Sequence, residues 1–405
     1  MRPSVPNSIA RRRDELTRAG LELTDLTDTN PTRHGLSNHA IAEIMARHAV
    51  RASRYEPSPR GPWPARAALA ERFGGDPDDY WLTASTSEAY GWLFTLLADP
   101  GDAVAVPQPG YPLIEPLARM HCLSTVAYGS YYVHPSGWEL DREALENMLS
   151  GRGQTGRFQF ADKRDGSSPR TKGTDPAPSG PLRAVVVVNP NNPTGAYADS
   201  ALLDVATEHG LPLIADEVFF PFQLAPPPEP ARRLSGSGET VTFGLDGLSK
   251  LLAAPQLKLG WIRLSGPGTA TNEVGRALDE IADTYLSVNT AVALALPDLL
   301  GLADASVARI TARLTNNLSV AKRVLEPLRI RTVYGGWMML VDVPPLMDAD
   351  DLCLALMERA GLFVHPGYFY DLPDATLAVS LLPEGPVFEE SCVRLAAAIA
   401  VFSGD

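Results

Sequence analysis

The sequence predicts a two-domain α/β protein, in which a doubly wound, mostly parallel sheet forms the larger domain. The chain has 405 residues, more than one hydrophobic core usually accommodates. Short apolar runs alternate with helical patterns over residues 75–265, which is typical of a parallel sheet covered by helices. We therefore expect an N-terminal arm with part of the smaller domain at 1–50, the larger domain at 51–290, and the smaller α/β domain at 291–405.

The larger domain is expected to begin with helices and to continue as alternating strands and helices. Residues 38–50 and ARAALAERF have the apolar spacing of helices, and the Pro- and Gly-rich stretch YEPSPRGPWP separates them. SEAYGWLFTLLAD and LIEPLARMH are further helical segments. The expected strands are the runs YWLTAS, AVAVPQ, STVAY, RAVVVV, LPLIAD and TVTFGLD.

The C-terminal part is expected to form the smaller domain. Residues 273–330 are mainly helical in pattern, with a long amphipathic stretch from Ala305 to Leu325. RTVYGGWMMLVDVP, LFVHPGYFY and ATLAVSLL then have the character of strands, and FEESCVRLAAAIAVF that of a closing helix. Residues 151–180 fit neither domain, because their Gly, Ser, Pro and charged residues bury too little apolar area. We expect a mobile surface insertion there.

Composition narrows the classes of function. The formal charge of -13 is unfavourable for binding nucleic acid or an anionic membrane surface, which both require a basic face. The three cysteines and seven histidines show no metal-ligand spacing, so we expect no metal site. The N-terminal residues lack the apolar run of a signal peptide, and the longest apolar stretch is too short to span a bilayer. A cytoplasmic location is the expectation that follows.

Three polar motifs follow expected strands of the larger domain. VVVVNPNNPTG ends at Gly195, IADEVFF contains Asp216, and GLSKLLAAPQLKLGW contains Lys250. A buried lysine has a lowered pKa, so its free amine can form an imine and later carry a proton. Each motif alone also has a structural interpretation: a turn, an aspartate that caps a helix, and a surface lysine. Their common position at strand ends favours one shared site, because ligands of doubly wound sheets bind there.

With these motifs the chain resembles the class I/II aminotransferases among the fold-type I pyridoxal phosphate enzymes, from about Leu26 onward. The resemblance implies that Lys250 forms the Schiff base with pyridoxal 5'-phosphate. It implies that Asp216 pairs with the pyridine nitrogen and keeps the ring protonated as an electron sink. Asn192 is implied as the donor to the phenolate oxygen. Glu217 is the lesser candidate for the ring nitrogen, because strand alternation turns it to the other face.

The phosphate and the ring are expected to be held by side chains at a strand-to-helix junction and near the lysine. The N–H groups and the dipole of a helix N-terminus favour an anion, and hydroxyls add donors. These residues are Thr86 and Ser87 in TASTSEAY, to which the resemblance adds Ser249, Lys258 and, stacked on the ring, Tyr111. Helix capping by Thr86 or Ser87 and core packing of Tyr111 are the structural alternatives.

Four positions depart from the family's pattern. Phe219 stands where a tyrosine is usual, which removes a hydrogen bond of about 0.5–1.5 kcal/mol to the cofactor. Lys258 replaces an arginine, and Gly247 a serine, near the phosphate. Ala378 in ATLAVSLL stands where the family has the arginine that grips the substrate's α-carboxylate. A carboxylate left without a cation loses on the order of several kcal/mol of binding.

The residues that contact the substrate are therefore expected elsewhere. Arg33 in DTNPTRHGL is the candidate to bind the carboxylate, because the family's N-terminal segment covers the substrate; a surface or helix-capping arginine fits the sequence equally. Tyr370 and its neighbour Tyr368 line the same pocket or pack. Family active sites form between two protomers, so the resemblance implies a homodimer, with Tyr55 a candidate phosphate contact from the neighbouring subunit.

The expected function is transfer of an amino group between an amino acid and a 2-oxo acid, with Lys250 carrying the proton. A lyase, cyclase or oxidase that acts on an amino acid is the alternative, because the same cofactor serves these reactions and the fold does not determine the outcome. A ligand-sensing regulator is disfavoured, since the chain is acidic and the segment before the resemblance is too short for a DNA-binding module.

Overall fold

The apolar runs of the larger domain form one eight-stranded sheet in the computed structural model of the protein, which describes residues 7–150, 180–345, 347–373 and 375–403. The expected insertion at 151–180 lies outside these ranges except for Gly180. The strand order is β2-β9-β8-β7-β6-β3-β4-β5. Neighbours from β8 through β4 pair in parallel, whereas β9 is antiparallel to β8 and to β2, and β5 is antiparallel to β4. The predicted mostly parallel sheet is therefore confirmed.

The strands of this sheet are β2 (Tyr80–Thr83), β3 (Ala103–Gln108), β4 (Ser124–Val133), β5 (Gly137–Leu140), β6 (Leu182–Val188), β7 (Leu213–Asp216), β8 (Thr242–Gly247) and β9 (Gly260–Ser265). Their side chains alternate between two apolar layers, as parallel strands buried on both faces require. Val186 and Ile214 pack toward α4 (Thr86–Leu97), α5 (Ile114–Met120) and α9 (Gly268–Tyr285). Val185 and Ala215 pack toward α6 (Arg142–Leu149) and α7 (Ala201–Glu208).

A third apolar layer covers the β2 and β9 edge of the sheet. It contains side chains of α2 (Ala40–Ala49), α3 (Trp63–Phe73), α8 (Leu248–Leu251) and α10 (Thr290–Leu300). The domain limit expected at residue 291 assigns most of α10 to the smaller domain, yet this helix packs on α2 and α3. Among the described residues, no single helix is long and apolar enough to cross a membrane; the bent pair of α10 and α11 passes such a test by length and composition.

The smaller domain is built from both ends of the chain. Its antiparallel sheet has the order β10-β11-β14-β13 (Arg329–Ile330, Met338–Asp342, Thr376–Ser380 and His365–Pro366). A parallel pair joins β1 (Thr24–Asp25) to β12 (Leu362–Phe363). The helices are α1 (Ser8–Arg18), α11 (Ala303–Val324), α12 (Ala349–Ala360) and α13 (Gly385–Ser403). One core joins Ile9 and Leu26 to Leu352 and Phe388, so the N-terminal segment is part of this domain.

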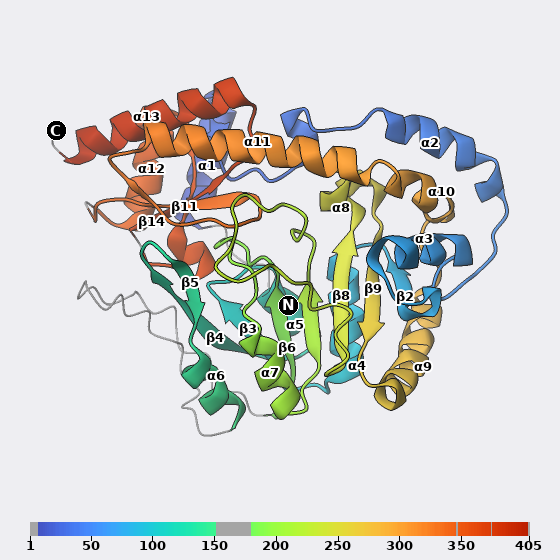
Figure 1. Cartoon of the computed structure of the whole chain (residues 1–405). Coiled ribbons are helices and arrows are strands. Elements are labelled where there is room, and N and C mark those ends of the chain that lie inside the picture. The colour runs from blue at the N-terminus through green and yellow to red at the C-terminus, as the bar shows by residue number, and fades with distance from the viewer. Residues whose placement is uncertain (1–6, 151–179, 346, 374, 404–405) are drawn as a thin grey trace.

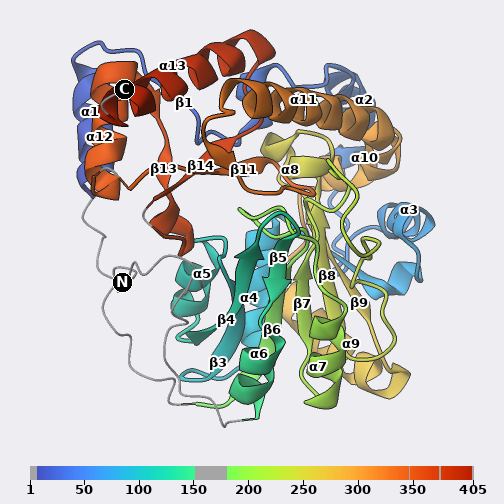
Figure 2. The ribbon, with the colours of Figure 1, turned by 60° about the vertical axis from the view of Figure 1, so that its left-hand side comes forward.

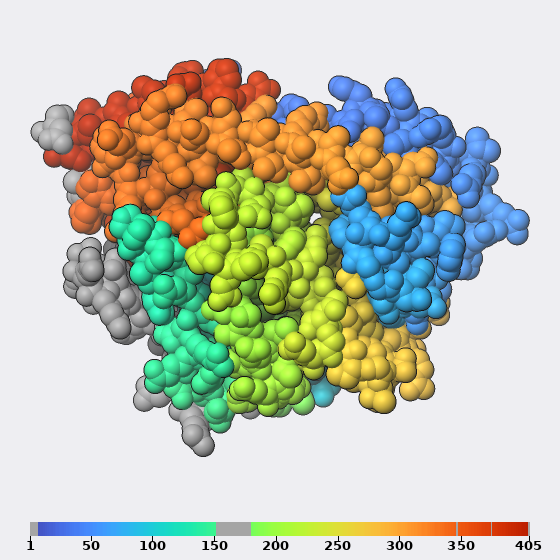
Figure 3. Space-filling model, viewed as in Figure 1, coloured from blue at the N-terminus to red at the C-terminus, as the bar shows by residue number. Residues whose placement is uncertain are grey.

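The smaller domain lies over the carboxyl ends of the parallel strands (Figure 1). Turned by 60°, the ribbon shows α6 and α7 on one face of the large sheet and α4 on the other (Figure 2). In the space-filling view, the orange α11 runs along the top of the molecule above the green and yellow segments of the larger domain (Figure 3). The loops that follow β6, β7 and β8 are therefore enclosed between the two domains.

Candidate functional site

The three sequence motifs meet at the carboxyl ends of β6, β7 and β8. These strands are adjacent, and Asp216 is in register with Val188 on β6 and Leu245 on β8. The Asn189 N–H donates to the carbonyl of Asp216 at 2.8 Å, and Lys250 lies in α8, directly after β8. The topology therefore brings the NPNNPTG loop, the aspartate and the lysine to one edge of the sheet, as predicted.

Asp216 is buried, with 7% of its surface exposed, and faces α4. The Tyr90 hydroxyl donates to Asp216 Oδ2 at 3.2 Å, and the Val218 N–H donates to Oδ1 at 3.3 Å. Burial is the main cause that raises the pKa of Asp216 to about 7, and the charge of Lys250 opposes it. Such a carboxylate gains most from a buried cationic partner, which a protonated ring nitrogen provides.

Lys250 extends into an aromatic enclosure. Its Nζ lies 4.8 Å from the ring centroid of Trp337 and 5.3 Å from that of Phe219. Burial lowers the pKa of Lys250 to about 8, while the carboxylates of Asp216 and Asp28 act in the opposite direction. The lowered pKa raises the share of free amine at neutral pH to about a tenth, far above that of a lysine in water, as nucleophilic chemistry requires.

The three asparagines of the NPNNPTG loop differ in their hydrogen bonds: two bond to the protein, and one has an oxygen without a partner. Asn189 donates to Glu217 Oε1 and accepts from the Ala198 N–H, and Asn191 donates to the carbonyl of Pro109. By contrast, the buried Oδ1 of Asn192 has no hydrogen-bond partner among the described residues. A buried polar atom without a partner is costly in a native protein, so this amide is available for a ligand.

The N-terminus of α4 lies close to the loops around Lys250. Ser85 caps the helix by accepting from the Glu88 N–H, so that Thr86 and Ser87 occupy the first turn and are not the cap. A Cβ placed on Gly260 would lie 3.3 Å from the carbonyl carbon of Ser85, and a Cβ on Gly247 would lie 3.1 Å from the Cα of Gly260. The glycines therefore allow three backbone segments to converge.

This convergence brings together the backbone segments that carry the predicted phosphate contacts. Ser249 is half-buried in α8, and Lys258, exposed and with a φ of 51°, precedes Gly260 by two residues. Helix N-terminal N–H groups, the hydroxyls of Thr86, Ser87 and Ser249, and the ammonium of Lys258 are a suitable donor set for an anion. The contacts themselves stay a prediction.

Two tyrosines border the site on the side of the smaller domain. The charge of Asp216, added to the effect of burial, raises the pKa of Tyr111, so the phenol lies near the aspartate. The Gly110 N–H donates to the carbonyl of Tyr370 at 3.3 Å, which ties the Tyr111 loop to the 3-10 helix η5 (Gly367–Tyr370). The Tyr370 hydroxyl lies 3.1 Å from His365 Nδ1. The hydroxyl of Tyr368 instead donates to Asp350 in α12 at 2.5 Å, so this residue packs within the smaller domain.

Arg33 and Ala378 lie where the substrate is expected. Ala378 is fully buried in β14, among Met338, Leu340 and Tyr370. Arg33 lies in the 3-10 helix η1 (Pro31–His34), with 71% of its side chain exposed and its Nη1 3.4 Å from Asp28 Oδ2. The candidate carboxylate-binding arginine is thus already paired with a carboxylate at the surface.

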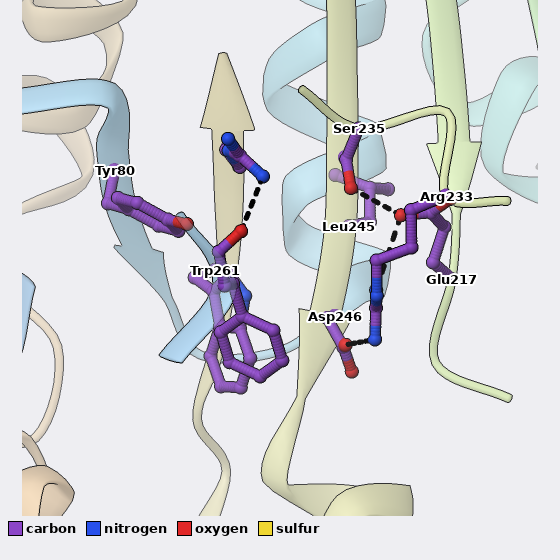
Figure 4. A pocket seen from close by; sticks show the side chains of 10 residues that line it. Tyr80, Glu217, Arg233, Ser235, Leu245, Asp246 and Trp261 are labelled. Atoms are coloured by element: carbon purple, nitrogen blue, oxygen red, sulfur yellow. Dashed lines mark hydrogen bonds and ion pairs between the residues drawn. The ribbon is translucent and has the colours of Figure 1, made fainter. Parts of the chain in front are cut away.

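A buried ionic network supports the site from behind (Figure 4). Arg233 lies between two carboxylates, with Nη1 at 3.2 Å from Glu217 Oε2 and Nη2 at 3.2 Å from Asp246 Oδ2. Glu217 also accepts from the Leu234 N–H at 2.7 Å and from the hydroxyl of Ser235. Asp246 accepts from the Gly247 N–H at 2.7 Å. Glu217 therefore serves the network and points away from Asp216, as strand alternation predicts.

This network connects the segments that carry the predicted cofactor residues. Glu217 follows Asp216 in the chain, Asp246 belongs to the strand that leads to Lys250, and Glu217 also accepts from Asn189. Burial raises the pKa of Asp246 to about 6, and its charge contributes to the raised pKa of Asp216. Sequence reasoning missed Arg233, Tyr90 and Trp337, because no local pattern indicates which distant residues pack behind a strand end.

Comparisons with known proteins agree with this geometry. The chain matches the family "Aminotransferase class I and II" over residues 28–395. Nicotianamine aminotransferase 1 of Oryza sativa subsp. japonica is 26% identical over 364 residues, which cover 81% of this chain and 65% of that protein. The S-alkyl-thiohydroximate lyase SUR1 of Arabidopsis thaliana is 27% identical over 287 residues, covering 65% of this chain and 52% of that protein.

Solved structures of aminotransferases share this fold. The structure of an alanine aminotransferase from Pyrococcus furiosus superimposes with a TM-score of 0.80 at 22% identity and covers 98% of both chains. The matched regions span less than two thirds of the length of the rice and Arabidopsis proteins, so these likenesses carry the family and not a substrate. Because the family match extends over nearly the whole chain, the protein belongs to the class I and II aminotransferases.

Proposed function

We propose that the protein is a pyridoxal phosphate-dependent aminotransferase, which moves an amino group between an amino donor and a 2-oxo acid. The observation that carries this proposal is the convergence of three groups. These are the amine of Lys250 with a pKa of about 8, the buried carboxylate of Asp216 with a pKa of about 7, and the side-chain amide of Asn192, which carries an NH2 donor and whose Oδ1 has no partner among the described residues. Each group is complementary to a different part of one ring-shaped, aldehyde-bearing, anionic cofactor.

The chemistry of these residues suits the parts of this cofactor. Lys250 would hold the aldehyde carbon, Asp216 the ring nitrogen and Asn192 the phenolic oxygen. The first turn of α4, Ser249 and Lys258 would hold the phosphate. When bound, the cofactor supplies an electron sink for the carbanion that loss of the α-proton creates.

The chain's own groups then control the proton. With the cofactor bound, Lys250 would serve as the base that removes the proton from the substrate's α-carbon and as the acid that returns it. Trp337 and Phe219 exclude water around its Nζ, which keeps its pKa low and its amine free. Asp216 stabilises positive charge on the ring nitrogen throughout.

The decisive test is an amino-donor panel on the purified holoenzyme without any acceptor, followed by addition of a 2-oxo acid. A transaminase converts the bound cofactor to its amine form, seen by absorbance, and releases one equivalent of carbonyl product. Addition of the acceptor restores the starting spectrum. Lys250→Ala should abolish both changes, whereas Lys322→Ala, an exposed lysine of α11, should leave them intact.

The second candidate function is elimination from an amino-acid substrate. It is favoured by the relative named as a lyase, and by Phe219, which offers no hydroxyl beside Lys250. A lyase releases its product and ammonia over many turnovers without converting the cofactor to its amine form. Ammonia release without that spectral change would replace the transaminase proposal by this one.

The proposed enzyme acts as a homodimer in the cytoplasm. Supporting the dimer, exposed apolar side chains gather on two segments that a hydrogen bond from the Ser58 N–H to the hydroxyl of Ser287 holds together at 2.8 Å. These side chains are Val50, Tyr55, Trp63, Tyr285 and Leu286, each half or more exposed. Exposed apolar surface of this kind marks interaction sites. Light scattering should give twice the chain mass of 43.5 kDa, and Trp63→Glu should shift it toward the monomer.

A further inference from the structure

Asp28 is a carboxylate that the N-terminal segment places at the substrate side of the site. The Ser380 N–H donates to the carbonyl of Leu26 at 2.7 Å, and the Ser380 hydroxyl donates to the carbonyl of Asp28 at 2.8 Å. The segment therefore runs along the end of β14. Among the described residues, the charges that act on Lys250 are the carboxylates of Asp216 and Asp28. The carboxylate of Asp28 thus acts on the charge of Lys250 from a segment that is bonded to the end of β14.

The two oxygens of Asp28 have different roles. Oδ1 accepts from the Asn30 N–H at 2.7 Å and so holds the turn of the N-terminal segment. Oδ2 has only long contacts: 3.4 Å to Arg33 Nη1, whose side chain is 71% exposed, and 3.7 Å to His34 Nε2. Burial lowers the pKa of His34, so this imidazole is neutral at pH 7. Oδ2 is therefore open to a better cationic partner than the mobile end of a surface arginine.

The wall between Asp28 and the larger domain is apolar. Met338, Leu340 and Ala378 lie on the same face of the small sheet, and all three are buried. Ala378 precedes Ser380 by two residues, which places it about 7 Å along β14 from the Asp28 anchor. The nearest buried arginine on this sheet, Arg331, already donates to Asp342 and Thr376. This face is covered by side chains that include Tyr370 and Leu372, and it offers no cation to a carboxylate.

We propose that the amino donor carries a second, cationic group, an ammonium or a guanidinium, which binds Asp28 Oδ2. This inference rests on the proposed aminotransferase function and deepens it. The donor's cation displaces Arg33 into solvent, where most of its side chain already lies. An α-carboxylate is not required, since the position of Ala378 gives it no partner. A charge-assisted hydrogen bond favours the cationic donor about 10–100-fold over its neutral isostere.

Four amino donors of similar shape distinguish the effect of the donor's cationic group from the effect of its α-carboxylate. Agmatine and N-carbamoylputrescine lack a carboxylate, arginine and citrulline carry one, and within each pair a guanidinium is replaced by a neutral urea. With the holoenzyme, kcat/KM for the donor half-reaction should be about 10–100-fold higher for each guanidinium compound than for its urea isostere. Agmatine should equal or exceed arginine. Equal rates within both pairs, or a requirement for the carboxylate, overturn the inference.

Asp28→Asn is the matched variant, because its amide oxygen retains the acceptor for the Asn30 N–H and only the charge is lost. The guanidinium preference should disappear: kcat/KM for each guanidinium donor, divided by that for its urea isostere, should fall to about one. Asp25→Asn is the control, since Asp25 accepts from Thr27 at 2.6 and 2.8 Å in a similar turn. Arg33→Ala should strengthen the preference. A loss confined to arginine and citrulline would instead assign Arg33 to a carboxylate and overturn the proposal.

A binding measurement removes the dependence on turnover. Propylguanidine and propylurea contain no primary amine, so they bind the holoenzyme without reacting. Calorimetry should give a dissociation constant about 10–100-fold lower for propylguanidine, and Asp28→Asn should make the two equal. If no donor of any kind changes the cofactor spectrum, the proposed function fails. If neutral donors react and the Asp28 variant behaves as the wild type, the function stands and this inference fails.

Discussion

The carboxyl ends of β6, β7 and β8 hold their polar side chains in hydrogen-bonded networks, whereas the sheet of the smaller domain that faces them is mainly apolar. On the first side, Asp216 is supported by Tyr90 and, from behind, by the Glu217, Arg233 and Asp246 network. On the second side, Ala378 and its neighbours offer packing surface. The comparison teaches that cofactor chemistry needs fixed charges, while the identity of the donor can change by substitution of a few wall residues.

The strongest test of this contrast is removal of the reactive amine. Lys250→Ala should lower kcat/KM by at least about 10³-fold, because both imine formation and proton transfer are lost. Lys322→Ala should change it by less than twofold. A Lys250 variant that keeps a tenth of the wild-type rate would show that the networks of the larger domain serve stability and not catalysis.

The network of Glu217, Arg233 and Asp246 should be nearly as sensitive to substitution, but the effect should appear in the stability of the protein. Arg233→Ala leaves Glu217 and Asp246 buried without their cation, so the free energy of unfolding should fall by about 3–5 kcal/mol in urea denaturation. Arg233→Lys keeps the charge without the fork and should lose less. Arg323→Ala, which removes an exposed pair with Glu389, should cost at most about 1 kcal/mol. Equal losses for the two alanine variants would contradict the distinction.

Asp216 should make the cofactor-free protein less stable as pH rises. The pKa of Asp216 is raised to about 7 in the folded chain and is about 3.9 when unfolded, so the folded state binds more protons between these values. Stability therefore falls as pH rises from about 4 to 7, by up to about 4 kcal/mol from this group. Asp216→Asn should flatten most of that slope; Asp246, with a pKa of about 6, retains a smaller part. Denaturation midpoints measured from pH 4 to 8 test this sign.

The smallest effect is expected for Phe219, which lies beside Lys250. Its substitution tests whether this residue belongs with the cofactor residues or with the substrate residues. Phe219→Tyr adds a hydroxyl near Lys250, in a ring position already packed on Trp337 at 5.4 Å. A restored hydrogen bond to the cofactor, about 0.5–1.5 kcal/mol, should lower its dissociation constant about 2–10-fold in a titration of the cofactor-free protein. The ratio of rates for arginine and citrulline should not change. A changed ratio would place Phe219 on the substrate side.

The sequence was sufficient for most of the larger domain, because its strands are continuous apolar runs and its polar motifs stand at their ends. Lys250, Asp216 and the NPNNPTG loop converge as expected, and the helical pattern over 273–330 becomes α9, α10 and α11. The smaller domain was less predictable. LFVHPGYFY, expected as a strand, forms two short strands, separated at Val364, and the 3-10 helix η5, which begins at Gly367 directly after Pro366.

What the sequence could not supply are contacts between distant segments. Trp337, which directly precedes β11, lies with its ring centroid 4.8 Å from the Nζ of Lys250, 87 positions earlier in the chain, and Arg233 joins Glu217 and Asp246 from a loop without a pattern of its own. Tyr90 appeared only as a residue of an apolar helix. In the motif DTNPTRHGL, Arg33 was the predicted substrate residue and Asp28 was not. Ser380, which donates to the carbonyl of Asp28, lies 352 positions away in sequence. Such roles depend on packing, which periodicity does not encode.

The pairing of β1 with β12 also has a consequence for how the protein is made. Residues near position 24 find their partners near position 362, so a growing chain must complete the whole larger domain before its first segment can bind. Contacts of such long separation form slowly, and until then the apolar residues around Ile9 and Leu26 are exposed to other chains. The segment that carries Asp28 thus takes its place at the end of synthesis, and selection of the donor is the last property of the enzyme to be completed.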